Sequence, residues 1–158
     1  ILVAQYKKGT PQERKKIYTL YLQNTEWINN WDLVDTSAEH IVGPWLDESK
    51  EKMKVLTTLA KSRNIWERRI AMLSTFHYIK KGKSEEALAI SKLLLQDEHD
   101  LIQKAVGWML REIGKRCSLQ EEENFLQKHY PKMPRTMLRY AIEHFPEIKR
   151  KAYLNGKI

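Results

Sequence analysis

The stretch that decides the fold reads Ile102-Gln103-Lys104-Ala105-Val106-Gly107-Trp108-Met109-Leu110-Arg111-Glu112. Its apolar residues recur at helical spacing, and helix-forming residues fill the positions between them. Lys104 has basic counterparts 35 residues away on either side, at Arg69 and Arg139. An apolar residue and then a small or β-branched one follow each of the three: Ile70 and Ala71, Ala105 and Val106, Tyr140 and Ala141. A repeat of this period predicts stacked helix pairs that carry the basic residues along one face.

The rest of the chain also reads as helix, since it holds only six glycines and no stretch with the alternation of a strand. Prolines, glycines and capping residues divide it into about ten short helices. We expect them over residues 10–22, 26–40, 48–60 and 64–80, from 84, over 99–113, from 118, over 135–145 and from 146. This pattern predicts an all-α fold, a curved α-solenoid of HEAT-like repeats in one domain over residues 1–158. An unrelated helical bundle with scattered surface charge is the alternative.

Charge is the strongest signal in the composition. Twenty-eight Lys and Arg residues against 20 Asp and Glu give a net charge of +8 and an isoelectric point near 9.5. This balance favours a polyanionic partner, nucleic acid first and an anionic membrane surface second. A basic soluble protein without such a partner is the alternative. No apolar run approaches the roughly 20 residues of a membrane span, so we expect no membrane segment.

Cysteine and histidine usage narrows the chemistry. Cys117 is the only cysteine, so no disulfide can form within the chain, and we expect an inert thiol and a reducing, cytoplasmic setting. We predict no metal site, because the five histidines lack ligand spacing: His40, His77, His99, His129 and His144. The chain begins Ile1-Leu2-Val3 without a methionine, as if inside a helix. We therefore expect it to be the C-terminal part of a longer fold.

Two tryptophans and a carboxylate recur at steps of four residues: Trp27, Trp31 and Asp35. On one helix over residues 26–40 these steps place all three on the same face. Two indoles are unusual for a solvent face, and a buried carboxylate is costly in a core unless it has a partner. The face is therefore a candidate site. The alternative places both indoles in the core and Asp35 at the surface or beside an arginine.

A second cluster combines cations with an indole. Lys104, Trp108 and Arg111 follow one another at steps of four and three, which places them on one helical face. Lysine and arginine bind phosphates, and an indole packs against a sugar or a base, so the cluster suits a DNA backbone. A cation–π stack at the surface, without a ligand, is the alternative.

Further arginines extend the basic face. Arg69 lies in register with Lys104, so we expect both on one concave surface. Arg135 and Arg139 are four residues apart, where like charges repel mildly, and an anionic ligand is a reason to tolerate them. Arg68 is expected to be exposed or to pair with a neighbouring acid.

Four segments, taken together, carry a resemblance to a known family. They are Asn30-Trp31-Asp32-Leu33-Val34-Asp35, Trp66-Glu67-Arg68-Arg69-Ile70-Ala71, Gln103-Lys104-Ala105-Val106-Gly107-Trp108-Met109-Leu110-Arg111-Glu112 and Met133-Pro134-Arg135-Thr136-Met137-Leu138-Arg139-Tyr140-Ala141-Ile142-Glu143. In content, order and spacing they resemble the DNA alkylation repair glycosylases of AlkD type, over nearly the whole chain. The resemblance implies a curved stack of HEAT-like repeats whose concave, basic surface binds duplex DNA. Members usually carry further helices before this point.

The resemblance also implies roles for individual residues. Asp35 resembles the family's catalytic carboxylate, and Trp31 resembles the tryptophan beside it. Trp108 resembles the second tryptophan, which lines the deoxyribose, and Arg69 resembles the arginine that completes the cleft. The other residues expected to contact DNA are Trp27, Lys104, Arg111, Arg135 and Arg139.

These expectations amount to a monofunctional glycosylase that acts as a monomer in base excision repair. The resemblance implies that it removes N3- and N7-alkylated purines from duplex DNA without a cofactor. Two alternatives stay open: a non-catalytic HEAT-like module that binds nucleic acid through the same face, and a scaffold for protein partners. Replacement of Asp35 separates the glycosylase from the nucleic-acid-binding module, because only a glycosylase has an excision activity to lose.

Overall fold

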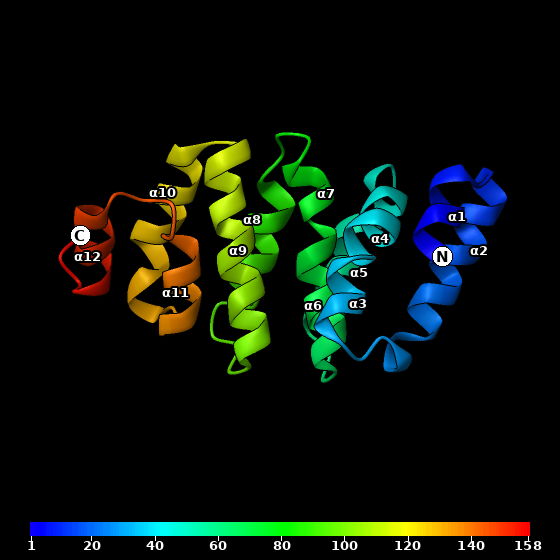
Figure 1. The fold of residues 1–158 in the computed structure, drawn as a ribbon, viewed down its shortest axis with the longest axis horizontal. Helices are drawn as coiled ribbons and strands as arrows, with labels where there is room; N and C mark the ends of the chain where they lie inside the picture. The colour runs from blue at the N-terminus through cyan, green and yellow to red at the C-terminus, as the bar shows by residue number, and fades with distance from the viewer.

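The computed structural model describes residues 1–158, and all of its regular secondary structure is helical (Figure 1). Its α-helices are α1 (Leu2–Lys8), α2 (Pro11–Gln23), α3 (Trp31–Asp35), α4 (Ala38–Asp47), α5 (Lys52–Ala60), α6 (Ile65–Ser74), α7 (Phe76–Ile79), α8 (Glu85–Leu93), α9 (Asp100–Arg116), α10 (Leu119–His129), α11 (Arg135–Ala141) and α12 (Glu147–Leu154). A 3-10 turn, η1 (Thr25–Trp27), lies between α2 and α3, and a second, η2 (Tyr130–Lys132), lies between α10 and α11. The predicted all-α class is confirmed. None of the helices combines the length and the apolar character that a membrane crossing requires.

Side-chain caps begin several helices where the sequence predicts them. The Thr10 hydroxyl accepts a hydrogen bond from the Glu13 backbone N–H at 3.3 Å, and Glu13 accepts one from the Thr10 N–H at 2.7 Å. Asn64 caps α6 through the Trp66 N–H, and Ser118 caps α10 through the Glu121 N–H. Each cap satisfies a backbone donor that the first helical turn would otherwise leave unpaired.

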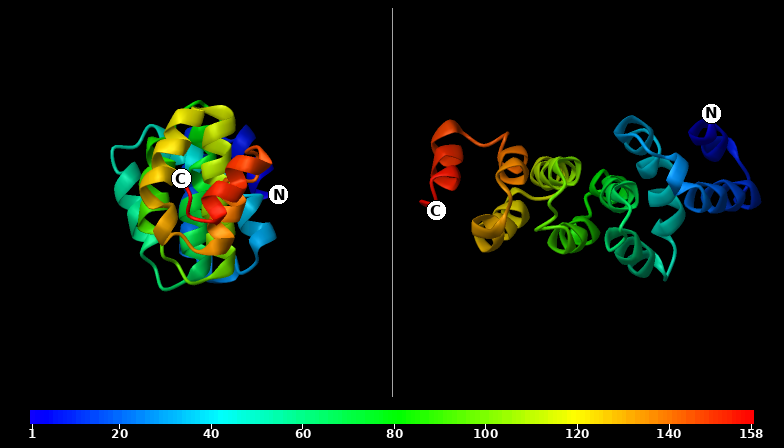
Figure 2. Two further views of the ribbon diagram at one scale, coloured as in Figure 1. Left: turned by 90° about the vertical axis from the view of Figure 1, so that its left-hand side faces the viewer. Right: turned by 90° about the horizontal axis from the view of Figure 1, so that it is seen from below.

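The middle of the molecule is built as two layers of helices. Seen from below (Figure 2, right), α5, α8 and α10 lie along one long side, and α6, α9 and α11 lie along the other. Helices α1 and α2 lie at one end of the row and α12 at the other (Figure 1). Because each helix of a layer follows one of the opposite layer in the chain, residues about 35 apart become neighbours within a layer.

The register residues lie where α6, α9 and α11 pack. Ile70, Ala71, Ala105 and Val106 are fully buried, as is Ala141. Burial of small side chains allows neighbouring helices to approach closely, and these residues belong to the continuous apolar core of the chain. Tyr140 differs from its register partners Ile70 and Ala105, since 38% of its surface stays exposed.

The predicted helix over residues 26–40 was wrong. Helix η1 ends at Trp27, residues 28–30 are not helical, and Asn30 begins a new helix by accepting the Asp32 N–H at 2.9 Å. At the start of a helix an asparagine side chain accepts a hydrogen bond from a free backbone N–H, whereas inside a helix it competes with the backbone hydrogen bonds. Asn30 therefore favours a break before α3. Trp27 therefore does not share a helical face with Trp31 and Asp35, which both belong to α3.

Other predicted helix boundaries also differ from those of the structure. Helix α4 continues through Gly43 and Pro44, and α9 continues through Gly114. Glycine ends a helix most readily at positive φ, and among the glycines only Gly82 and Gly156 have it. The helix expected over 64–80 divides at Thr75, whose hydroxyl donates to the Met72 carbonyl at 2.6 Å, a bond that competes with the helical ladder.

Candidate active site

A cleft of about 250 Å³ is lined mainly by residues of α6, α9 and α11. Four helices contribute its lining: Trp31 from α3, Arg69 from α6, Leu101, Lys104 and Trp108 from α9, and Tyr140 from α11. These residues are far apart in the sequence, so the fold alone brings them together. The cleft thus contains two indoles, a phenol and two cationic side chains.

Arg69 holds a carboxylate beside this cleft. Its Nε donates to one oxygen of Asp35 at 2.8 Å, and one terminal nitrogen donates to the other oxygen at 2.7 Å. The second terminal nitrogen donates to the carbonyl of Leu101 in the first turn of α9. Only 6% of the Arg69 side chain and 15% of the Asp35 side chain are exposed. The guanidinium therefore ties α3, α6 and α9 together and fixes the carboxylate in one orientation.

The two tryptophans of the cleft differ in their freedom. Trp31 is 54% exposed at the start of α3. Trp108 is half-buried, packs against the apolar core, and contacts the ring of Phe76 at an interplanar angle of 59°, with the ring centroids 5.6 Å apart. Trp108 therefore forms a fixed wall, while the Trp31 indole is free to adjust to a ligand.

Lys104 is the more available of the two cations. Its ammonium contacts the carboxylate of Asp100, one helical turn earlier, at 2.6 Å, and both side chains are substantially exposed. The hydrogen bond to Asp100 raises the pKa of Lys104, so the side chain stays cationic at neutral pH. Exposed pairs of this kind contribute only about 0–1 kcal/mol, so a phosphate can replace Asp100 as the partner.

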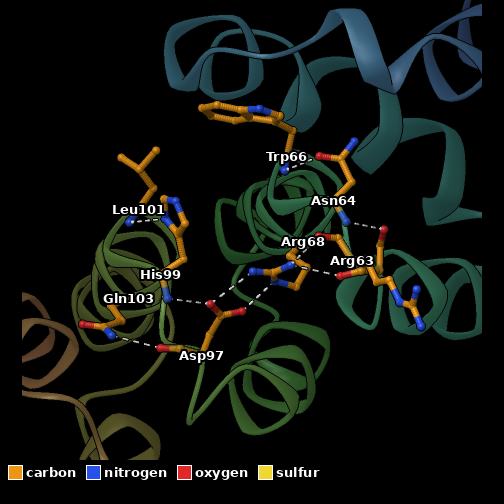
Figure 3. A network of polar contacts seen from close by, with 9 residues as sticks. Arg63, Asn64, Trp66, Arg68, Asp97, His99, Leu101 and Gln103 are labelled. Carbon is orange, nitrogen blue, oxygen red and sulfur yellow. Dashed lines mark hydrogen bonds and ion pairs between the residues drawn. The ribbon is translucent and has the colours of Figure 1, made fainter.

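A second arginine of α6, Arg68, lies at the centre of a polar network outside the cleft (Figure 3). The Nε of Arg68 donates to Asp97 at 2.6 Å, and its Nη1 donates to the Ser62 carbonyl at 3.0 Å. Asp97 also accepts the His99 N–H at 2.9 Å, while His99 caps α9 through the Leu101 N–H at 3.2 Å. This network joins the loops that precede α6 and α9, so it fixes the starts of both helices.

The comparison with protein families supports a family assignment. The sequence profile of the DNA alkylation repair enzymes matches residues 1–145, most of the chain and every residue of the cleft. The chain belongs to the DNA alkylation repair enzyme family. A comparison with curated proteins finds no match. A repair enzyme of this family acts on DNA, which agrees with the net charge of +8.

In this repair enzyme, the cleft and its border contain five of the nine site residues that the sequence predicts, and these five are Trp31, Asp35, Arg69, Lys104 and Trp108. Asp35 borders the cleft through Arg69 rather than lining it. From the sequence, an arginine partner for Asp35 was an alternative to a site. The structure has both, because Asp35 pairs with Arg69 and Arg69 lines the cleft.

The other four predicted residues do not line the cleft of the repair enzyme. Arg111 pairs with Glu143 and approaches Glu112 at 3.8 Å, and Arg135 donates to the Leu154 carbonyl at 2.5 Å. Arg139 is exposed, and Trp27 is 68% exposed on its separate turn. Any contact of these four with DNA remains a prediction and would lie outside the cleft. Arg111 lies outside the cleft because it pairs with carboxylates, and Trp27 lies outside it because the helix is broken before α3.

Sequence reasoning missed two residues that line the cleft, Leu101 and Tyr140. Leu101 contributes a backbone carbonyl to Arg69, and no side-chain pattern shows this role. Tyr140 directly follows Arg139 in the 35-residue register. Its polar hydroxyl at a position that is apolar in the other repeats was the available signal.

Proposed function

We propose that this repair enzyme is a DNA glycosylase that hydrolyses the N-glycosidic bond of N3- and N7-alkylated purines in duplex DNA. The observation that carries the proposal is a carboxylate, Asp35, held by Arg69 at the edge of a cleft walled by Trp31 and Trp108. The family match supports alkylation damage as the target. We further propose that the helix pairs are HEAT-like repeats of a single curved domain, which acts as a monomer.

The chemistry needs little from the protein at the base itself. An N3- or N7-alkylated purine is cationic and therefore a good leaving group without protonation. Positive charge develops on the deoxyribose as the bond breaks, as in other glycosidic hydrolyses. A fixed negative charge and electron-rich ring faces near the sugar stabilise this charge. Asp35 supplies the charge, and the indoles of Trp31 and Trp108 supply the ring faces.

Arg69 decides how Asp35 can act. Each carboxylate oxygen accepts one hydrogen bond from the guanidinium, and each keeps a second lone-pair position for a water molecule. In the proposed mechanism Asp35 orients the attacking water and accepts its proton as the water adds to the sugar. The Arg69 pair keeps the carboxylate from turning away.

The test is release of 7-methylguanine from methylated duplex DNA by the protein and by Asp35→Asn. We expect excision to fall at least tenfold, since loss of one preorganised electrostatic group typically costs about 10²–10³ in rate. Affinity for the duplex should stay within about threefold, because the change removes no phosphate-binding cation. Equal excision by both proteins would remove Asp35 from the mechanism.

The chain offers a matched control in the neighbouring Arg–Asp pair. Asp97→Asn breaks the contact to Arg68, which is also largely buried but lies outside the cleft. Each substitution leaves an arginine without its carboxylate and should lower the free energy of unfolding by about 3 kcal/mol. Below the unfolding temperature only Asp35→Asn should lose excision. A similar loss in both variants would attribute the effect to stability.

One observation favours a second candidate, a DNA-binding module without catalysis. Both oxygens of Asp35 already bind Arg69, so the pair as a whole is neutral. A purely structural tie between α3, α6 and α9 would look the same. This candidate predicts salt-dependent DNA binding and no release of 7-methylguanine at any DNA concentration. The excision assay above therefore distinguishes the binding module from the glycosylase.

A further inference from the structure

Tyr140 is the residue of the cleft to which neither the sequence pattern nor the proposed mechanism gives a role. It lies on α11, at the opposite end of the cleft from Trp31 on α3. Its hydroxyl has no hydrogen-bond partner within the chain. An unpartnered phenol that lines a cleft with 38% of its surface exposed is available to a ligand.

The packing of α11 on α9 determines where this phenol lies. A Cβ at Gly107 would approach the Cβ of Tyr140 to 2.5 Å and would also overlap the Met137 carbonyl. Only glycine therefore allows α11 to lie this close, with Tyr140 directly over the backbone next to Trp108. The base of the Tyr140 side chain is thus fixed against α9, and the ring extends along the cleft wall.

The remaining groups of the cleft restrict the kind of ligand. Arg69 already uses its guanidinium on Asp35 and Leu101, whereas Lys104 pairs only with the exposed Asp100 and can exchange it for a ligand. Tyr140 and Lys104 line the same cleft. An ammonium, a phenol hydroxyl and two indole N–H groups make the cleft rich in donors, and a phosphodiester offers only acceptors.

We propose that the Tyr140 hydroxyl and the Lys104 ammonium together bind the phosphodiester next to the sugar that Trp31 and Trp108 enclose. Tyrosine and lysine side chains are common phosphate ligands in DNA complexes. The contact places the DNA backbone along the lip of the cleft and the sugar against the indoles. This inference rests on the proposed function for the presence of DNA in the cleft, but not on excision.

Binding of a fluorescent duplex, measured across a series of KCl concentrations, tests the contact. Tyr140→Phe should weaken the duplex complex about tenfold, because one hydrogen bond to a charged group is lost. The slope of log K against log salt should stay unchanged. Lys104→Ala should weaken binding and reduce that slope by about 0.9, the value for one phosphate contact. The double variant should lose less than the product of the single losses, since both groups bind one phosphate.

Matched controls make the same chemical changes away from the cleft. Tyr18→Phe removes a hydroxyl from a tyrosine of α2 that stacks on Trp45, and Lys128→Ala removes an exposed cation of α10 on the opposite layer. Neither change should weaken binding more than about twofold. Circular dichroism of all variants confirms that the helices are intact.

Two outcomes would overturn the contact. One is full additivity in the double variant, and the other is wild-type affinity for Tyr140→Phe. If Tyr140→Ala alone binds more weakly, the ring stacks on the ligand and the hydroxyl does not bind it. The contact and the glycosylase proposal fail separately. Binding that depends on Tyr140 without excision refutes only the enzyme, whereas Asp35-dependent excision with unaltered Tyr140→Phe binding refutes only the contact.

Discussion

At the scale of the residue, the two tryptophans of the cleft have the same proposed role but differ in how much each stabilises the fold. Trp108 is partly buried against the core and against Phe76, while Trp31 leaves more than half of its surface in solvent. Burial of apolar surface stabilises a fold roughly in proportion to its area. The contribution of each indole to stability and its contribution to chemistry can therefore be separated.

Trp108→Ala should lower the free energy of unfolding by about 2–4 kcal/mol, because it leaves a cavity beside Phe76. Trp31→Ala should lower it by less than about 1 kcal/mol, as is usual for an exposed position. Both variants should release 7-methylguanine more slowly at a temperature where they are folded. Urea unfolding with the excision assay checks both parts. A large loss of stability in Trp31→Ala, or full activity in either variant, would contradict the assignment.

At the scale of the element, Gly107 decides how α9 and α11 pack. A glycine inside a helix usually costs about 1 kcal/mol relative to alanine, so Gly107→Ala would stabilise an isolated α9. In the folded protein the added methyl meets Tyr140 and Met137, and we expect a net loss of about 1–3 kcal/mol. Thermal unfolding measures the sign. A gain in stability would show that α11 can move away without cost.

Sequence patterns predict the elements well wherever a local interaction determines them. Thr10, Asn64 and Ser118 begin helices by capping, and Pro146 precedes the last one. The break at residues 28–30 was missed because the step-of-four pattern of the tryptophans continues across it. Periodicity gives the face of a helix only if the helix is unbroken, and Asn30 was the sign that it is not.

The candidate site was predictable to the extent that it depends on register. Arg69, Lys104 and Trp108 follow from a period of 35 residues together with the family resemblance. The bidentate contact between Arg69 and Asp35 spans 34 residues, and its geometry depends on how α3 packs against α6. Tyr140 depends on a close approach that Gly107 permits, and a single sequence does not reveal such an approach.

At the scale of the whole molecule, a buried acid links stability to pH. Glu122 of α10 is fully buried with its Oε2 3.2 Å from the Nε2 of His144. Burial, with a smaller effect of Glu123, raises its pKa from 4.5 to about 9, against the opposing charges of Lys149 and Arg111. Burial also lowers the pKa of His144, so both groups are neutral at pH 7.

The unfolded chain ionises Glu122 from about pH 4.5, while the folded chain keeps the proton up to about pH 9. The stability that this group contributes is therefore complete below pH 4.5 and is lost as the pH rises towards 9. Glu122→Gln cannot ionise and should lose less stability between pH 6 and pH 9 than the wild type, by up to about 1.4 kcal/mol per pH unit.

Urea unfolding midpoints at pH 6 and pH 9 measure this difference. Glu85→Gln, on the exposed first turn of α8, serves as the control and should follow the wild type at both values. His144 should not interfere, because its lowered pKa affects stability only as the pH falls below about 6.5. Equal losses in Glu122→Gln and the wild type would mean that the buried carboxyl is already ionised at pH 6.

The five-residue helix α3 is too short to persist by itself, and the contact of Asp35 with Arg69 anchors it to the rest of the chain. We expect that, when this contact opens and the buried Val34 of α3 also comes loose, Trp31 and Asp35 move away together while α6 and α9 stay folded. The fraction of molecules competent for catalysis is thus set by a local equilibrium of one short segment rather than by global unfolding. On warming, excision activity should be lost over a temperature range in which nearly all of the helical structure is still folded.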